Sequence, residues 1–348
     1  MNYPLSFTVA IISCFIILRL LYPIAVKIRL VDKPNERKIH AGEIPLIGGL
    51  AMFAGFVIAV LASVPDLNHV RGLLIASSIL IIVGVLDDHH DISVRLRFVL
   101  QIIAVLVMTS FSNVVVTDLG NLFGMGVFQL AGWAIPFTVV AAVGSMNATN
   151  MIDGVDGLAG STSLICFLAV LFLYSLAGDM ALKPLLFVGV LIPFMLNNIA
   201  SARKVFMGDS GSMFIGFGIG WVLLEASQGN NTVMSPVTAL WIFAIPLIDM
   251  WAIMLRRVMK GQSPFLPDRD HLHHIFLRAG FSDRATLNIM SLIAVLFACV
   301  GILGHVYQVP EWVMFAGFIL ILTAYIWGIR HVWAVLKYVR QRSEKHAV

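Results

Sequence analysis

Long runs of apolar residues recur along the chain, and they limit its possible folds more than any other feature. A helix crosses the hydrocarbon core of a bilayer with about 20 apolar residues, and eleven segments approach or reach that length. Only 12% of the 348 residues are charged, whereas a soluble domain carries roughly 25%. The chain therefore lacks the polar side chains needed to cover a soluble core, and we expect an all-α polytopic integral membrane protein.

The predicted spans are 5–26, 46–64, 71–86, 96–111, 133–149, 160–177, 185–200, 211–227, 237–255, 286–306 and 312–330. The third and fourth are short, so their helices are expected to extend at their polar ends. No repeat or linker is visible, which indicates one transmembrane domain over 1–330. The basic tail, 331–348, is typical of an interfacial helix held by anionic lipid headgroups, although a role in orientation alone explains it equally well.

The distribution of basic residues orients the chain, because Lys and Arg concentrate in cytoplasmic loops. Of the 23 Lys and Arg residues, twenty lie in 27–45, 87–97, 201–204, 256–285 and the tail from Arg330, two (Arg71 and Lys183) lie on the other side, and Arg19 lies within the first span. We expect the N-terminus outside, the C-terminus in the cytoplasm, and cytoplasmic loops at 27–45, 87–97, 150–160, 201–210 and 256–285. The net charge of +4 then reflects orientation, and no nucleic-acid partner is expected.

Three acidic clusters stand where predicted spans meet the cytoplasm, and the first is Asp87-Asp88-His89-His90-Asp91. If the helix continues by one turn, Asp87 and Asp91 share a face and Asp88 lies about 100° around the axis. Adjacent carboxylates repel, so they are normally held by a cation or carry a raised pKa. The alternative is a solvated helix end with no function. It is disfavoured because negative charge at a helix C-terminus interacts unfavourably with the helix dipole.

The other two acidic clusters contain glycines that leave room for a ligand. Asn150, Asp153 and Asp156 recur every third residue, with Gly154 and Gly157 between and after the acids; a flexible acidic loop is the alternative. Asp209 follows a glycine at the start of the eighth span, where plain helix capping would also explain it. Because the three clusters converge on one membrane face, we predict that Asp209, with Asp88, holds a metal ion. Oxygen ligands favour Mg²⁺, with Mn²⁺ as the alternative.

A basic and histidine-rich loop faces these acids on the predicted cytoplasmic side. It contains Arg256, Arg257, His271, His273 and His274. Three histidines in four positions could indicate zinc, but no thiolate stands nearby, and arginine with histidine fits a pyrophosphate better. No G-x-x-x-x-G-K-[ST] motif occurs, so a P-loop is excluded.

Two ionisable residues lie inside predicted spans. Asp249 is about two turns deep, and an intramembrane acid indicates a functional site by default. Arg19 is more simply explained by a side chain that reaches toward the interface.

These loops resemble the polyprenyl-phosphate N-acetylhexosamine-1-phosphate transferase superfamily, most closely its members that use undecaprenyl phosphate and N-acetylglucosamine (GlcNAc). The matching motifs are Val31-Asp32-Lys33-Pro34-Asn35, Pro45-Leu-Ile-Gly48-Gly49, Asp87-Asp88 with Asp91-Ile-Ser, Asn150 with Asp153-Gly-Val-Asp156-Gly, Lys204-Val-Phe-Met-Gly-Asp209, Ser235-Pro-Val-Thr-Ala-Leu-Trp241 and His271-Leu-His273-His274. Each motif alone is weak, but their order and spacing together are specific, and they run from the first cytoplasmic loop to near the tail.

The resemblance implies a magnesium-dependent glycosyl-1-phosphate transferase in a bacterial inner membrane, with its active site on the cytoplasmic face. UDP-GlcNAc and undecaprenyl phosphate would give undecaprenyl-diphospho-GlcNAc and UMP. This product initiates lipid-linked cell-surface polysaccharides such as the O-antigen of lipopolysaccharide. The resemblance also suggests a homodimer embedded in the lipid bilayer.

The resemblance also implies roles for individual residues. Asp209 would hold Mg²⁺, and Asp87 and Asp88 would act at the lipid phosphate. Arg257 and His271 would contact the sugar diphosphate. The remaining substrate-binding candidates are Asp32, Asp91, Asn150, Asp153, Asp156, His273 and His274.

Alternatives differ in substrate, class and mechanism. Leu272 interrupts the run of three consecutive histidines that is typical of relatives transferring a muramoyl-pentapeptide phosphate, but another UDP-N-acetylhexosamine donor stays open. A secondary transporter would place its polar groups near the bilayer midplane, where only Arg19 and Asp249 lie. Transfer could proceed in one step or through a covalent aspartate intermediate. We favour one step, because a phosphate monoester with a second pKa of about 6 is already largely dianionic near pH 7.

Overall fold

The computed structural model describes residues 2–32, 42–112, 114–229, 232–263 and 271–346. The helices are α1 (Tyr3–Ile28), α2 (Gly48–Ser63), α3 (Arg71–His90), α4 (Val94–Ser112), α5 (Ala134–Ile152), α6 (Leu158–Leu176), α7 (Leu182–Ile199), α8 (Gly208–Ser227), α9 (Pro236–Ile242), α10 (Ala244–Met259), α11 (Leu272–Arg278), α12 (Asp283–Val306) and α13 (Glu311–His346). Short 3₁₀ turns cover Leu67–His69 and Ala131–Trp133, and strands β1 (Val31–Asp32) and β2 (Ile44–Pro45) pair antiparallel. Segments 33–41 and 264–270 lie outside the described residues, and the whole Lys33-Pro34-Asn35 part of the first matching motif lies within the former.

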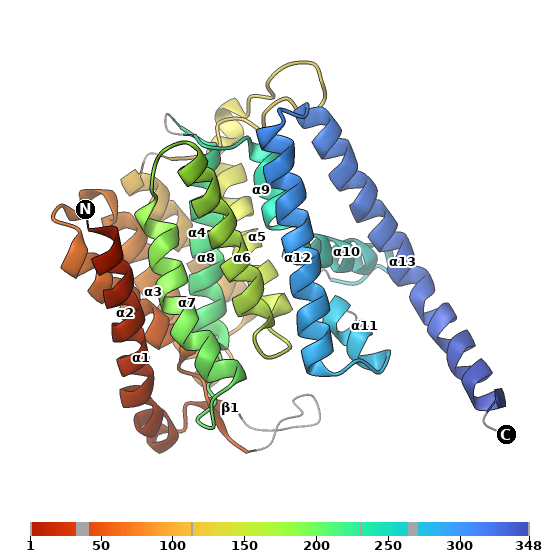
Figure 1. Ribbon diagram of the computed structural model, residues 1–348, viewed down its shortest axis with the longest axis horizontal. Helices are drawn as coiled ribbons and strands as arrows, with labels where there is room; N and C mark the ends of the chain where they lie inside the picture. The colour runs from red at the N-terminus through yellow and green to blue at the C-terminus, as the bar shows by residue number, and fades with distance from the viewer. Residues whose placement is uncertain (1, 33–41, 113, 230–231, 264–270, 347–348) are drawn as a thin grey trace.

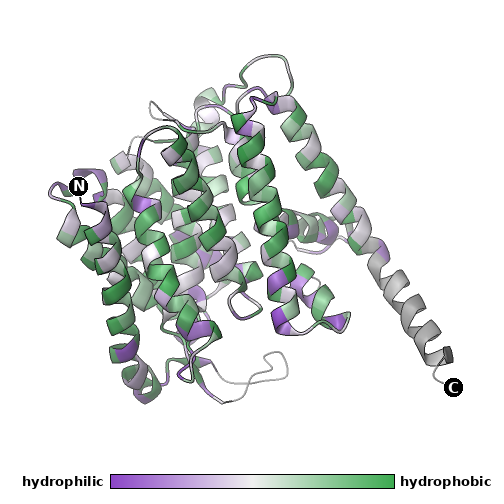
Figure 2. Cartoon of the chain, in the orientation of Figure 1, coloured by the Kyte–Doolittle hydropathy of each residue, from purple (hydrophilic) through white to green (hydrophobic). Residues whose placement is uncertain are grey.

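The protein is an α-helical polytopic membrane protein, as the apolar runs predicted. Among the described residues, nine helices are long and apolar enough to cross a membrane, and the bent pair α9–α10 raises this to ten. The predicted span at 46–64 forms only the shorter apolar helix α2, Gly48–Ser63. The predicted count of eleven spans therefore stays a prediction. Hydrophobic residues predominate along α1, α6 and α12, while hydrophilic residues gather toward the helix ends (Figure 2).

The helix of the predicted span 237–255 is not continuous, because α9 and α10 meet at 85°. The sequence signal for this bend is Pro246, which lies in the first turn of α10. A proline there would clash with the carbonyl four residues earlier in a continuous helix, whereas its missing N–H is harmless in a first turn. Figure 1 shows the consequence: α9 runs alongside α12, and α10 lies across the direction of the other helices.

Helix α8 forms the centre of the bundle, because its side chains are almost all buried. It packs against α2, α3, α5, α6 and α7. Without a hydrophobic drive between helices in lipid, close approach of small residues supplies the packing energy. At Gly84 of α3 a Cβ atom would lie only 2.2 Å from the Cα atom of Ser210. This contact brings the C-terminal end of α3 against the first turn of α8. In the predicted orientation, this is the cytoplasmic end of α3.

The last predicted span and the tail form one continuous helix. Helix α13 runs from Glu311 to His346 without a break and slopes away from the bundle toward the C-terminus (Figure 1). At the opposite end of the bundle, the segment between α4 and α5 forms a small hairpin, closed by an antiparallel bridge between Asp118 and Gln129. Strand β1 and helix α11 lie toward one end of the molecule, and the hairpin lies at the other end (Figure 1).

Candidate active site

Asp88 links the end of α3 to the start of α8. Its Oδ1 accepts a hydrogen bond of 2.7 Å from the backbone N–H of Asp209, and its Oδ2 accepts from the N–H and the hydroxyl of Ser210 at 3.3 and 3.1 Å. A carboxylate is favourable there because the first N–H groups of a helix lack partners within the helix and carry partial positive charge. Asp88 thus caps α8 from a neighbouring helix and fixes the backbone that carries Asp209.

Gly208 makes this capping contact possible. Its φ is +70°, a conformation that costs other residues roughly 1–2 kcal/mol. A Cβ atom here would also lie 2.6 Å from Oδ2 of Asp88. The glycine before Asp209 is therefore required by backbone geometry and by the close approach of the Asp88 carboxylate.

Asn150 ties the second acidic cluster to the third. It lies in the last turn of α5, so the helix extends beyond the predicted span end at 149. Its amide nitrogen donates hydrogen bonds to the Oδ1 of Asp209 and, at 2.9 Å, to the hydroxyl of Ser212. The structure therefore brings Asn150, Asp88 and Asp209 together, as the sequence predicted for three clusters on one face.

Asp153 follows α5 and faces the same group of acids. Asp153 is exposed to solvent, although many protein atoms lie near its carboxyl group. Desolvation by these atoms, followed by repulsion from Asp209, Asp156 and Asp88, raises the pKa of the Asp153 carboxyl to about 7. Four carboxylates close enough to repel one another are typical of a site that receives a cation.

Lys204 and Asn198 hold the loop after α5. The sequence analysis assigned no site role to either residue. Lys204 forms an ion pair with Asp156. The Asn198 side chain accepts from the N–H of Gly157 at 2.6 Å and donates to the carbonyl of Val205 at 2.8 Å. Lys204 and Asn198 lie more than 40 residues from Asp156 and Gly157, and no spacing rule joins positions so far apart.

Asp87 points to different partners from its neighbour Asp88. It is 6% exposed; its Oδ2 accepts from Arg97 at 3.0 Å, and its Oδ1 accepts from the N–H of Ile92 at 3.0 Å. These contacts hold the turn between α3 and α4, in which Asp91 ends α3 with a φ of 49°. The predicted catalytic role of Asp87 at the lipid phosphate stays a prediction.

The histidine motif lies against the acidic loop. His273 is 1% exposed, and a Cβ atom at Gly154 would lie 2.2 Å from its Nε2. Desolvation, followed by repulsion from His274, lowers the pKa of His273 to about 3, although Asp249 opposes the shift. His273 is therefore neutral at physiological pH. Its ring packs against Gly154 of the acidic loop. Its predicted contact with substrate stays a prediction.

The other predicted site residues occupy the same end of the molecule. His271 precedes α11 and pairs with Asp249 of α10. His274 is half-buried on the first turn of α11, and Arg257 is buried in the last turn of α10. Asp32 lies on β1, which pairs with β2 through Ile44.

The donor set determines which metal ion the site could hold. Within the described parts of the chain, no three His, Cys, Asp or Glu side chains are arranged to hold a metal by themselves. Mg²⁺ usually takes one or two carboxylates and completes its shell with water and substrate phosphates. Asp209, beside three further acids, fits such a shared ion. Zinc fits less well, because Asp249 already accepts from the His271 ring and His273 lies buried under Gly154.

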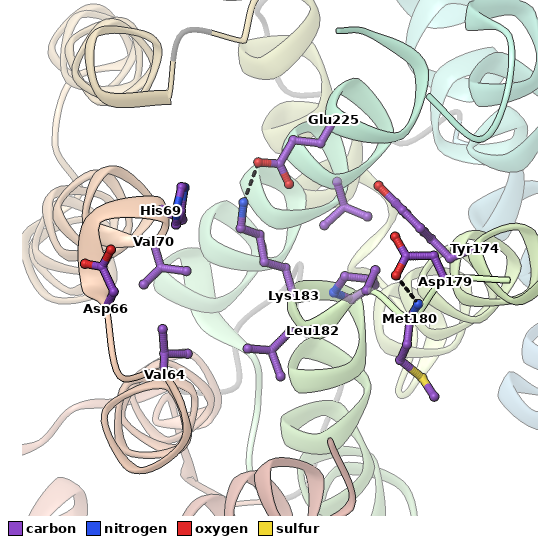
Figure 3. A pocket seen from close by; sticks show the side chains of 13 residues that line it. Val64, Asp66, His69, Val70, Tyr174, Asp179, Met180, Leu182, Lys183 and Glu225 are labelled. Carbon is purple, nitrogen blue, oxygen red and sulfur yellow. Dashed lines mark hydrogen bonds and ion pairs between the residues drawn. The ribbon is translucent and has the colours of Figure 1, made fainter. Parts of the chain in front are cut away.

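A separate pocket of about 270 Å³ lies at the other end of the bundle (Figure 3). Helices α6 and α8 begin at the acidic cluster, and their far ends supply Tyr174 and Glu225 to this pocket. Glu225 forms an ion pair with Lys183, and Asp66 and His69 line the opposite wall. The pocket is thus a helix length away from Asp209.

The chain is similar to known proteins over nearly its whole length. The model of the family described as "Glycosyl transferase family 4" matches residues 70–227. The chain is 43% identical over 324 residues to the undecaprenyl-phosphate alpha-N-acetylglucosaminyl 1-phosphate transferase of Yersinia pestis, covering 91% of this chain and 89% of that protein. The protein of the same name from Haemophilus influenzae is 41% identical over 347 residues, covering 98% of each chain. The one from Escherichia coli strain K12 is 40% identical over 324 residues, covering 91% and 88%.

Proposed function

The chain belongs to glycosyl transferase family 4, and from this premise we propose that it transfers GlcNAc-1-phosphate from UDP-GlcNAc to undecaprenyl phosphate. The products are undecaprenyl-diphospho-GlcNAc and UMP. One observation carries the proposal: Asp88, Asn150, Asp153 and Asp209 meet at one end of a membrane-type bundle, in a chain that matches transferases of this name over nearly its whole length.

The reaction joins a water-soluble donor to a lipid acceptor, so it needs a polar site beside an apolar surface. The acidic cluster supplies the polar site. Helix α10 meets α9 at 85°, is joined to His271 through Asp249, and exposes Trp251, Leu255, Val258 and Met259. This apolar surface supports binding of a polyprenyl chain next to the phosphate-handling residues, at the cytoplasmic interface of a bacterial inner membrane.

The chain's own residues would position the two phosphates. In phosphoryl transfer, positioning and charge neutralisation supply most of the catalysis. A Mg²⁺ ion held by Asp209 would neutralise charge on the phosphate oxygens. Asp88 fixes the backbone of Asp209, Asn150 holds its carboxylate, and Lys204 holds Asp156 in the adjacent loop. Asp87 would accept or orient the remaining proton of the lipid phosphate, which would then attack the donor directly in one step.

The decisive test uses purified protein reconstituted with undecaprenyl phosphate. We expect Mg²⁺-dependent release of UMP from UDP-GlcNAc that requires the lipid, together with exchange of labelled UMP into UDP-GlcNAc. The donor should be selective, so UDP-GalNAc should react more slowly. Equal or faster transfer from UDP-GalNAc would refute the assigned donor, and UMP release without lipid would favour a covalent intermediate.

Orientation follows from the distribution of basic residues and is tested separately. Single cysteines replacing His90 or Ala202, two exposed positions near the acidic cluster, should resist an impermeant thiol reagent added outside intact cells. Met125 in the opposite hairpin is 88% exposed, so M125C is the positive control and should react. Cys299 is replaced by serine beforehand, because it is exposed while Cys14 and Cys166 are buried. Labelling at position 90 or 202 from outside would reverse the predicted topology.

Homodimer formation also rests on the resemblance. Cross-linking in native membranes would detect it.

A further inference from the structure

Asp249 is a buried acid whose hydrogen bonds join three separate elements. It lies in α10 and is 2% exposed. Its Oδ2 lies 2.7 Å from Nδ1 of His271, and its Oδ1 accepts from the N–H of Leu272 at 3.0 Å and from the hydroxyl of Tyr325 at 2.6 Å. Helix α10, the start of α11 and the middle of α13 therefore meet at one carboxylate.

The contact with Asp249 determines which nitrogen of His271 carries a proton. An ionised carboxylate can only accept hydrogen bonds, so the short contact requires a proton on Nδ1. Nε2 is then the ring nitrogen that can meet a substrate oxygen, as an acceptor in the neutral ring or as a donor in the imidazolium. Loss of the carboxylate would allow the ring to rotate or to move its proton to Nε2.

The surroundings hold the carboxylate itself in place. Ala252, Ile275 and Ile329, from α10, α11 and α13, form a small apolar cluster against which Tyr325 packs. His271 occupies one oxygen of Asp249. Leu272 and Tyr325 both donate to the other oxygen. A fully hydrogen-bonded buried carboxylate of this kind is rigid, because every displacement breaks bonds that no water replaces.

We infer that Asp249 is a positioning residue of the transferase, which fixes the tautomer and orientation of His271 so that Nε2 faces the sugar diphosphate. Tyr325 extends the arrangement to α13 by holding the other oxygen of the same carboxylate. This inference rests on the proposed function and on the predicted contact between His271 and the donor substrate. It accounts for an acid placed deep in an apolar helix, a feature that the acidic clusters leave unexplained.

The first test compares D249N and H271Q with the double variant, using the reconstituted holoprotein. D249N should lower kcat by about ten- to a hundredfold with a smaller change in the KM for UDP-GlcNAc, because orientation matters most in the transition state. If Asp249 acts through His271, D249N should change the rate of H271Q by less than about threefold. An equally large loss in both backgrounds would overturn the inference and assign Asp249 a structural role.

Matched variants separate positioning from simple loss of a buried charge. E225Q removes the carboxylate of the Lys183–Glu225 ion pair at the opposite end of the bundle (Figure 3) and should leave kcat unchanged. Y325F keeps the carboxylate and removes one donor, so we expect a loss smaller than that of D249N. Glutamine places its amide nitrogen near the position of Nε2, whereas asparagine places it near Nδ1, so H271Q should retain more activity than H271N. The reverse order would contradict the assignment of Nε2.

A second test reads the tautomer without activity. In protein labelled with ¹⁵N-histidine, the His271 resonances are assigned by their absence in H271Q. We expect a protonated Nδ1 in the wild type and a mixture of tautomers in D249N. An unprotonated Nδ1 in the wild type would refute the inference whatever the enzyme transfers. Absence of wild-type transfer with the expected tautomer present would instead refute the proposed function.

Discussion

D209N should abolish most of the transferase activity while the protein still folds. Asparagine keeps the size of the side chain and can still accept the hydrogen bond from Asn150, but it removes the charge that would attract Mg²⁺. Loss of one charge–metal contact costs about 3 kcal/mol in the transition state, which corresponds to a rate lower by on the order of 10²-fold. The measurement is kcat for GlcNAc-1-phosphate transfer over a range of Mg²⁺ concentrations.

The control for this variant is D179N. Asp179 is an exposed carboxylate near the pocket at the other end of the bundle, so its replacement changes net charge equally and should leave kcat and Mg²⁺ dependence intact. Thermal unfolding in detergent should be similar for both variants. If D209N kept the wild-type rate and metal dependence, Asp209 could not be the principal metal ligand.

D87N should slow transfer strongly at neutral pH, and a second substitution can show whether the cause is chemical or structural. The single variant leaves the Arg97 guanidinium, 3.0 Å from Oδ2 of Asp87, without its charged partner. Breaking a partly buried ion pair from one side destabilises the fold by up to about 3 kcal/mol. The Tm should therefore fall, and the rate should fall as well.

The double variant D87N/R97Q removes both charges and should recover most of the Tm. If Asp87 handles the proton of the lipid phosphate, the rate of the double variant should be lowest below the second phosphate pKa of about 6 and should recover partly as the pH rises through that pKa, since the acceptor then ionises without help. Full recovery of the rate in the double variant would mean that Asp87 acts only by holding the turn between α3 and α4. Trapping a phospho-sugar on Asp87 would establish the two-step route instead.

Asp87 and Asp88 show which features of the site could be predicted from the sequence and which could not. Their adjacency predicted a charged helix end close to a cation, and the extension of α3 to His90 confirmed the helix. Which of the two faces Asp209 depends on where α8 lies relative to α3. Gly84 allows that placement through its close contact with Ser210. The periodicity of apolar residues in α3 shows that one face is buried, but it does not show which helix packs there. The same limit applies to Lys204 with Asp156, whose pairing requires α7 and the loop after α5 to be neighbours.

The sequence alone determined the class of the protein, because a bilayer leaves an apolar chain almost no choice but helices that satisfy their own backbone. It also determined which polar residues lie at helix ends, since burying them in lipid would be costly. Only the tertiary structure decided the side-chain partners: the carboxylate of Asp88 on the N-terminus of α8, and that of Asp249 on His271 and Tyr325, 22 and 76 residues away. Hydrogen bonds act over about 3 Å, so they depend on which helices touch, and helix packing rather than local pattern determines that.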